Sequence, residues 1–215
     1  MTYGKFPLKG LLKGKLLRTA ELQDKLVIEL TSRFEITLHG GTAIWRVYKG
    51  KRFSSDIDIY YANPAEILKY FEKSEAFKLV RGKLTSSDVL YMRFKEGNVL
   101  VEVEASPLFR KIQSTDGEFY LVGGDSIVLK TLTPSELLRE KINAFRSRRK
   151  ARDLYDIFYL LDIADTGKIK NELKGLVPCL KDMPKDFSGL KELILIGKTP
   201  DFETVVRKVR IYAKD

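Results

Sequence analysis

The chain has 215 residues, of which 44% are hydrophobic, so it can bury the core of one compact unit or of two small units that share a core. Its formal net charge of +10 suggests a polyanionic partner, with tRNA or another RNA as the natural candidate. One histidine and one cysteine exclude histidine-dependent metal clusters and an internal disulfide, and the lack of a signal-peptide core or a ~20-residue apolar run favours a cytoplasmic protein without membrane contact.

The first segment with a chemical signal is Gly40-Gly41-Thr42, which joins a predicted strand to a predicted helix. Glycines adopt backbone angles closed to other residues and let a ligand approach the main chain. The start of the next helix offers unpaired N–H groups that suit a phosphate, and Thr42 could cap that helix or donate its hydroxyl to the phosphate. We therefore predict that Gly40, Gly41 and Thr42 bind phosphate. The elements expected up to this point are an amphipathic helix, a strand and a short helix, at residues 19–33, 34–38 and 42–48.

The second signal is the pair Asp56 and Asp58, at the start of a strand expected over residues 57–61. Side chains two apart on a strand share a face, so both carboxylates point the same way. Adjacent carboxylates repel unless a cation neutralises them, and Mg²⁺ (or Mn²⁺) prefers such oxygen ligands together with substrate phosphates. An Asp-x-Asp pair also occurs on the polar face of ordinary surface strands. The upstream glycine turn and Arg52-x-Ser54 favour a metal site for phosphoryl or nucleotidyl transfer.

Further along the chain, a strand of alternating apolar and acidic residues supplies a candidate third carboxylate. Glu102 and Glu104 share one face of this strand, so either could reach a metal held by the aspartates, or both could be solvated on an edge strand. Gly123-Gly124-Asp125 resembles another phosphate loop, but flanking apolar runs predict the turn of a hairpin. The helix and the two paired strands of this region are expected at residues 63–74, 91–95 and 99–104.

From Thr133-Pro134-Ser135-Glu136 onward the chain is expected to be mainly helical. Lys141 falls among the apolar positions of the first helix, where it could neutralise a triphosphate or help a pyrophosphate leave. Between Arg139 and Arg152, seven basic residues accompany one acidic residue, as on a solvated basic face or a footprint for nucleic acid. The pattern predicts an α+β fold with a catalytic domain and a helical C-terminal domain, at residues 1–130 and 131–215.

Two motifs in this order resemble the signatures of a known family. Gly-Gly-Thr-Ala at residues 40–43 and Arg-x-Ser-x-Asp-x-Asp at residues 52–58 are similar to the DNA polymerase β-like nucleotidyltransferase superfamily, and more narrowly to its AbiEii/AbiGii toxin branch. The second signature of that branch is a Glu-Lys-x-x-Ala helix leading to Lys-x-Arg-Asp-x-x-Asp, found here at residues 140–144 and 150–156. The resemblance spans roughly residues 34–162.

The resemblance implies a mixed nucleotidyltransferase sheet flanked by helices and followed by a helical region. It implies metal-dependent transfer of a nucleoside monophosphate from an NTP to an acceptor hydroxyl. The acceptor would be a tRNA 3′ end, and the chain would be the toxin of a type IV-like toxin–antitoxin system, with a cognate antitoxin protein as a partner. Which NTP is used remains open.

The resemblance also suggests roles for individual residues. Glu104 matches the family's third acidic position better than Glu102, although the superfamily often has Asp there. Lys141 and Asp153 become candidate catalytic residues, with Asp153 orienting a basic side chain or the acceptor hydroxyl, while Asp156 could cap or pair within its helix. The implied metal ligands are Asp56, Asp58 and Glu104, and the implied nucleotide-binding residues are Gly40, Gly41, Thr42, Arg52, Ser54 and Lys141.

Two alternatives stay open on the sequence. The same site could transfer the nucleotide to a protein Ser, Thr or Tyr hydroxyl. A non-catalytic module that binds RNA or a protein partner through a decayed site is the other alternative, and the intact pair Asp56 and Asp58 argues against it.

Overall fold

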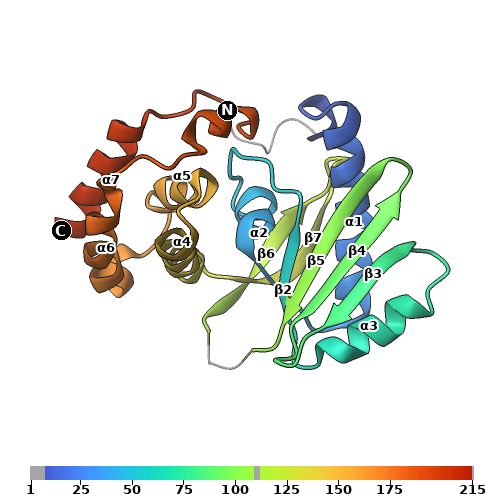
Figure 1. The fold of residues 1–215 in the computed structure, drawn as a ribbon. Coiled ribbons are helices and arrows are strands. Elements are labelled where there is room, and N and C mark those ends of the chain that lie inside the picture. Colours follow the sequence, from blue (N-terminus) through green and yellow to red (C-terminus); the bar gives the residue numbers. More distant parts are fainter. Residues whose placement is uncertain (1–7, 109–111, 215) are drawn as a thin grey trace. The chain divides into compact units, whose positions relative to one another are not determined.

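The computed structural model of the protein describes residues 8–108 and 112–214. The chain divides into two compact units, the first formed by Met1–Lys49 and Ser54–Thr131 and the second by Gly50–Phe53 and Leu132–Asp215. The first unit holds a mixed sheet of seven strands and the second is helical, so the predicted α+β class is confirmed (Figure 1).

Helices and strands alternate along the first unit up to β3, and strands β4 to β7 then follow without a helix between them in the described part of the chain. Its strands run in the order β3-β4-β5-β2-β1-β7-β6 across the sheet. Neighbouring strands are parallel in the β2–β5 and β1–β7 pairs and antiparallel in the β1–β2, β3–β4 and β4–β5 pairs. The elements are α1 (Gly14–Arg33), β1 (Thr37–His39), α2 (Gly40–Arg46), β2 (Ile57–Tyr60), α3 (Pro64–Glu72), β3 (Leu79–Leu84), β4 (Leu90–Glu96), β5 (Val99–Ser106), β6 (Ser114–Tyr120) and β7 (Ser126–Leu132).

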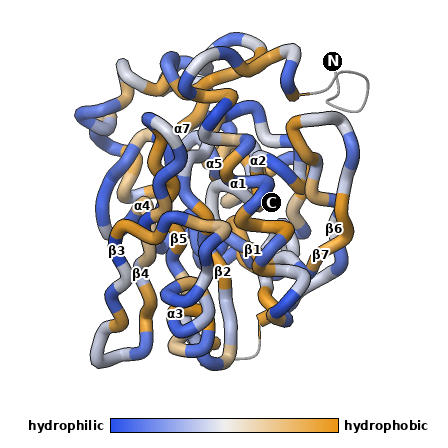
Figure 2. Tube along the Cα trace, turned by 90° about the vertical axis from the view of Figure 1, so that its right-hand side faces the viewer, coloured by the Kyte–Doolittle hydropathy of each residue, from blue (hydrophilic) through white to orange (hydrophobic). Residues whose placement is uncertain are grey.

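The alternating pattern of the strands gives the β2–β5–β4–β3 half of the sheet two different faces. Val99, Val101, Val103 and Ala105 of β5 are buried, whereas the residues between them are at least partly exposed. The same alternation runs along β4, and Figure 2 shows it as changes of colour along the tube. Helices α1 and α3 pack against the apolar face (Figure 1). The polar face therefore remains available for chemistry.

The observed elements differ from the predicted ones mainly around the glycine turn. The predicted strand at residues 34–38 is shifted to Thr37–His39 because Phe34 still donates its N–H to Leu30 O at the end of α1. Helix α2 begins at Gly40 and not at Thr42, so both glycines form its first turn and His39 is the N-cap. The predicted pairing of β4 with β5 is confirmed.

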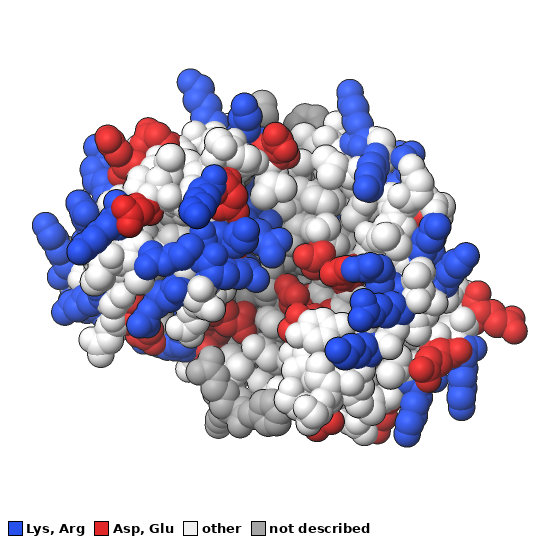
Figure 3. Space-filling view, viewed as in Figure 1, with Lys and Arg blue, Asp and Glu red and all other residues white. Residues whose placement is uncertain are grey.

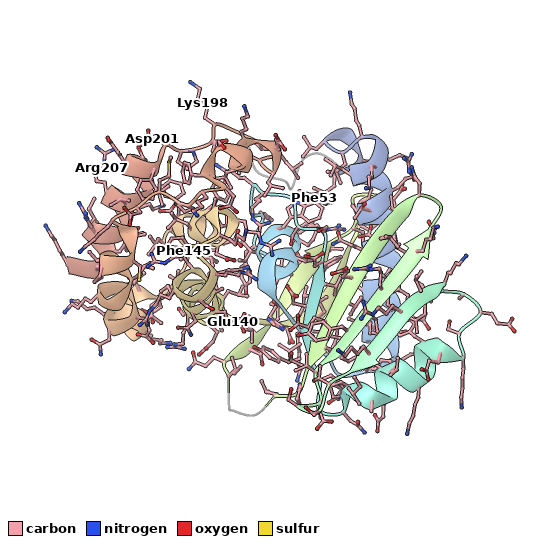
Figure 4. The ribbon with its side chains drawn as sticks, in the orientation of Figure 1. Phe53, Glu140, Phe145, Lys198, Asp201 and Arg207 are labelled. Atoms are coloured by element: carbon pink, nitrogen blue, oxygen red, sulfur yellow. The ribbon has the colours of Figure 1, made fainter. Side chains whose placement is uncertain are left out.

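The second unit begins with two packed helices, α4 and α5. Thr133 accepts a hydrogen bond from the Glu136 N–H through its side chain and so caps α4, and the predicted apolar positions, including Phe145, are buried (Figure 4). The C-terminal tail ends in a 13-residue helix, α7. The α-helices of this unit are α4 (Pro134–Arg148), α5 (Ala151–Leu160), α6 (Lys170–Leu176) and α7 (Phe202–Lys214), with 3₁₀ turns at Thr166–Ile169, Val177–Leu180 and Phe187–Glu192. Among the helices of residues 8–108 and 112–214, none has the length and apolar composition needed to cross a membrane.

Candidate active site

The two strands at the middle of the sheet bring two acidic residues together. Asp58 of β2 and Glu104 of β5 are direct partners in a parallel register, and both lie on the polar face. Asp56 comes two residues before Asp58, and Ser55 Oγ donates a hydrogen bond to its Oδ1 at 3.0 Å. The structure thus places Asp58 and Glu104 on two adjacent strands of the first unit, with Asp56 just before the first of these strands.

Gly40 lies beneath the Asp58 carboxylate. Its φ of +70° lies in the left-handed region that favours glycine. A methyl group on Gly40 would lie 2.7 Å from Cγ and 2.9 Å from Cβ of Asp58, and closer still to Oδ2. The glycine therefore allows the backbone at the start of α2 to lie against the side chain of Asp58.

Thr42 and the buried Gln23 hold this turn in place. The Thr42 side chain is fully buried and its hydroxyl donates a hydrogen bond to the backbone carbonyl of Asp56. Gln23 Nε2 of α1 donates to Ser54 O at 3.0 Å and lies 3.5 Å from Thr42 Oγ1. The single hydroxyl proton of Thr42 is thus used inside the protein, so a phosphate at this turn would contact backbone groups.

Gln23 was not identified as a site residue from the sequence. It lies on the apolar stripe of α1, where Leu22, Leu26 and Leu30 are buried. A polar residue at a buried helix position usually forms hydrogen bonds inside the protein. The position of Gln23 among the apolar residues of α1 was therefore the sequence signal for its role.

The structure distinguishes the two glutamates of β5. Glu104 is the partner of Asp58, and Ser106 Oγ lies 3.4 Å from its Oε1. Glu102 is paired with Arg93 of β4, whose Nε donates to Glu102 Oε1 at 2.9 Å, and both side chains are exposed. The negative charge of Glu104 also raises the pKa of Tyr91, its partner on β4. This geometry favours Glu104 as the third carboxylate.

The chemistry of the acidic residues fits a hard divalent cation. Asp58 and Glu104 on one sheet face, with Asp56 just before β2, offer the oxygen ligands that Mg²⁺ and Mn²⁺ prefer. Within the described ranges, no three Asp, Glu, His or Cys side chains already stand close enough to one another to hold a metal ion. The backbone thus brings the donors to one place, and their side chains would have to converge on the ion.

The residues of the second signature form a buried ion-pair network in the second unit. Lys141 Nζ of α4 lies 3.0 Å from Asp156 Oδ2 and 3.7 Å from Asp153 Oδ1 on α5. Arg148 forms two 2.7 Å hydrogen bonds to Asp153. Both aspartates are almost fully buried, and Lys141 is only 7% exposed. Asp153 therefore contacts two basic side chains, those of Arg148 and Lys141.

Arg52 belongs to the same network, although it precedes β2 in the chain. Its Nε and Nη2 donate to the two carboxylate oxygens of Asp156 at 2.8 and 2.7 Å, and its Nη1 donates to Phe53 O at 2.8 Å. A bridge between Arg52 and Ile194 also ties residues 50–53 to the second unit. The motif Arg-x-Ser-x-Asp-x-Asp is therefore divided, with Arg52 in the second unit and the residues from Ser54 onward in the first.

The pairing of Arg52 with Asp156 favours the charged forms of both groups despite their burial. Burial raises the pKa of Asp156, but Arg52 and Lys141 lower it more, and the net pKa lies below the ordinary value. Burial lowers the pKa of Arg52, whereas Asp156 raises it to a net value above the usual one. Bidentate pairing between a guanidinium and a carboxylate is among the strongest charge-assisted interactions in proteins.

Comparisons with known proteins bear on the family and the fold of the chain. A family model described as "Nucleotidyl transferase AbiEii toxin, Type IV TA system" matches residues 28–181. Among solved structures, the chain is similar to JHP933 from Helicobacter pylori, with 19% identity, a TM-score of 0.67 and coverage of 94% of this chain and 92% of that chain. It is also similar to MenT4, a nucleotidyltransferase toxin from Mycobacterium tuberculosis H37Rv, with 18% identity, a TM-score of 0.66 and coverage of 94% and 84%. No curated protein matches the chain. The two structural likenesses establish the fold.

Proposed function

Because the chain belongs to the AbiEii nucleotidyl transferase toxin family, we propose that it moves a nucleoside monophosphate from an NTP to the terminal hydroxyl of a tRNA. The chain is thus a nucleotidyltransferase of a toxin family, and the resemblance found in its two signatures is confirmed by the match over residues 28–181. The proposed reaction is supported above all by Asp58 and Glu104, in register on adjacent strands beside Gly40. As a member of a toxin–antitoxin family, the protein would have a cognate antitoxin as a partner.

Asp56, Asp58 and Glu104 are the residues that would hold Mg²⁺ or Mn²⁺. A bound divalent ion supplies charge neutralisation for the transferred phosphoryl group. The protein's own contributions are positioning and proton transfer. Backbone N–H groups at Gly40 and Gly41 would bind the phosphates, and Glu104 would accept the proton of the attacking hydroxyl.

Lys141 and Asp153 are the proposed catalytic residues of the second unit. Lys141 would offset the charge of the departing pyrophosphate, and Asp153 would hold the lysine in position. Arg52 and Ser54 remain proposed nucleotide-binding residues. The Arg52 guanidinium has five N–H groups, and within the described ranges three of them make the hydrogen bonds to Asp156 and Phe53.

The charge of the second unit supports RNA as the acceptor. Residues 50–53 and 132–215 contain 20 Lys and Arg residues against 13 Asp and Glu residues, which accounts for seven of the ten surplus positive charges. Figure 3 shows basic side chains gathered over α4 and α5 of this unit. Arg146, Lys150 and Arg152 are among the exposed ones. Such clusters are the electrostatic footprint of nucleic-acid binding.

Label transfer tests the proposal directly. The purified protein would be incubated with Mg²⁺, total RNA and each of the four NTPs labelled at the α-phosphate. We expect label in a tRNA-sized product that is sensitive to RNase and resistant to protease, with the rate reduced on the order of a hundredfold or more in Asp58→Asn. A protease-sensitive, RNase-resistant product would identify a protein acceptor instead. No transfer from any NTP, or equal transfer by Asp58→Asn, would refute the proposed reaction.

A further inference from the structure

Asp58 and Glu104, here called the acidic pair, begin a longer row of side chains across the sheet. Asp58 is the partner of Glu104, Glu104 is the partner of Tyr91 on β4, and Tyr91 is the partner of Lys83 on β3. Partner residues on neighbouring strands project from the same face. Adjacent strands are about 4.8 Å apart, so Tyr91 lies roughly one strand spacing and Lys83 roughly two from Glu104.

A second row next to the first is rich in arginine. Glu102 of β5 is the partner of Arg93 on β4, and Arg93 is the partner of Arg81 on β3. Arg93 and Glu102 neutralise one another through their ion pair. Arg81 and Lys83 are exposed, and no ion pair of either residue is recorded in the described part of the chain. The outer strands of this face therefore carry a surplus of positive charge.

Protection of the sheet edge against pairing with other chains explains only some of the exposed residues on the polar face of β3 and β4. Charged residues on an edge strand such as β3 discourage pairing with other chains, and Arg81 and Lys83 would serve that purpose. Tyr91, however, is on the inner strand β4, and the residue is 47% exposed on a face that α1 and α3 do not cover. An exposed aromatic ring between carboxylates and basic side chains suits a nucleotide base. In Figure 3, basic side chains lie beside the acidic ones over this part of the sheet.

The geometry of the proposed reaction decides which reactant would use this surface. In nucleotidyl transfer the attacking and leaving oxygens lie roughly in line, on opposite sides of the phosphorus. In the strand order, β1 with the following Gly40 lies on one side of the acidic pair, and β4 and β3 lie on the other. If the departing pyrophosphate lies on the Gly40 side, the acceptor hydroxyl must approach across β5 and β4.

We propose that the polar face of β4 and β3 binds the single-stranded 3′ end of the acceptor RNA, with Tyr91 stacking on a base and Lys83 and Arg81 contacting phosphates. This inference rests on the proposed nucleotidyl transfer and adds the path of the acceptor strand. It also assigns separate surfaces of the first unit to the two substrates, with the NTP phosphates next to Gly40 and the RNA on β4 and β3.

The test is RNA binding measured by fluorescence anisotropy, without NTP, on a short 5′-labelled single-stranded RNA with a free 3′ hydroxyl. Tyr91→Ala should weaken binding roughly tenfold because stacking is lost, whereas Tyr91→Phe should bind like the wild type because the ring remains. Lys83→Ala should lower the slope of log affinity against log salt by about 0.7, as expected for one lost phosphate contact with a single strand. Lys69→Ala, an exposed lysine of α3 on the covered side of the sheet, is the matched control and should have no effect.

The outcomes separate this inference from the proposed reaction. Binding of NTP with Mg²⁺, measured by calorimetry, should be unchanged in Tyr91→Ala, and in turnover only the half-saturating RNA concentration should rise. RNA affinity within twofold of wild type in Tyr91→Ala would overturn the inference even if label transfer occurs. A loss of RNA affinity in Tyr91→Phe equal to that in Tyr91→Ala would overturn the stacking role. If Tyr91→Ala reduced only the labelling of a protein acceptor, RNA would be overturned as the ligand of this surface.

Discussion

At Gly40, both the backbone conformation and the space left by the site require glycine. Its positive φ favours glycine, and the Asp58 carboxylate occupies the space that a Cβ atom would need. Gly97, in the turn between β4 and β5, also has a positive φ, of +55°, but among the described residues nothing beyond its chain neighbours lies within 4 Å of the Cβ position. A comparison of substitutions at the two glycines therefore separates the effect of backbone strain from the effect of displacing Asp58.

Substitution of Gly40 and Gly97 by alanine tests this separation. Gly97→Ala should cost about 1–2 kcal/mol of unfolding free energy, because alanine is strained in the left-handed region, and Gly40→Ala should cost more because its methyl group also meets Asp58. Only Gly40→Ala should also displace Asp58, so its transfer rate should fall on the order of a hundredfold while Gly97→Ala stays near the wild-type rate. Chemical unfolding and label transfer measure the two effects. Equal activity in the two variants would contradict the role of Gly40.

Individual residues were predictable from the sequence where chemistry dictates the residue type. The glycine turn and the Asp-x-Asp pair could be predicted because few other residues satisfy those backbone and charge requirements. The hydrogen bonds of Thr42 with Gln23 and Asp56 could not, because they join parts of the chain that only the fold brings together. Arg52 shows the same limit, since its partner Asp156 lies 104 positions further along.

At the scale of elements, α4 and α5 are joined by charges as well as by apolar packing. Three cations, Arg52, Lys141 and Arg148, share the carboxylates of Asp153 and Asp156. Removing one partner of a buried pair leaves an uncompensated charge in a poorly solvated position. Replacing both partners of a buried pair together should therefore destabilise the protein less than replacing one partner alone.

A double-mutant cycle on Arg52 and Asp156 measures this coupling. Arg52→Met alone should lower the free energy of unfolding by about 3–5 kcal/mol, and the double variant Arg52→Met/Asp156→Leu should lose less than the sum of the single variants. Lys25→Ala, which breaks the exposed pair with Glu96, is the control and should cost about 1 kcal/mol or less. The measurement is urea unfolding. A cost for Arg52→Met as small as that of the control would contradict the structural role of the pair.

The lowered pKa of Asp156 predicts the acid sensitivity of the fold. A carboxyl group with a depressed pKa in the folded state stabilises the protein above its unfolded pKa of about 3.9. That stabilisation is lost as the pH falls through the lower folded value. The melting temperature of the wild type should therefore decline more steeply below about pH 4 than that of Asp156→Asn. Parallel declines in the two proteins, followed by circular dichroism, would count against the ionised state of Asp156.

Strands and helices with clear periodicity were predicted well, and their ends were not. The alternation in β5 and the capping sequence of α4 both correspond to observed elements. The start of α2 differed because the turn at Gly40 is already helical, and β1 was shifted because α1 ends at the residue where the strand was expected to begin. Such boundaries depend on individual backbone hydrogen bonds, which periodicity does not report.

At the scale of the whole molecule, the two signatures are carried mainly by different units. The acidic residues and the glycine turn are in the first unit, and the lysine and its aspartates are in the second, which also carries most of the surplus positive charge. Local sequence patterns did not reveal that residues 50–53 pack with the second unit, because their contacts at Ile194 and Asp156 are distant in sequence.

The central claim is that the site transfers a nucleotide and not a terminal phosphate. The most direct measurement compares two labelled forms of one NTP, with the label at the α-phosphate or the γ-phosphate, in parallel reactions with RNA and Mg²⁺. We expect RNA to be labelled from the α-labelled NTP alone, with the γ-label released as pyrophosphate, and this labelling to be lost in Asp58→Asn. Labelling of RNA from the γ-labelled NTP, or labelling that persists in Asp58→Asn, would contradict nucleotidyl transfer at this site.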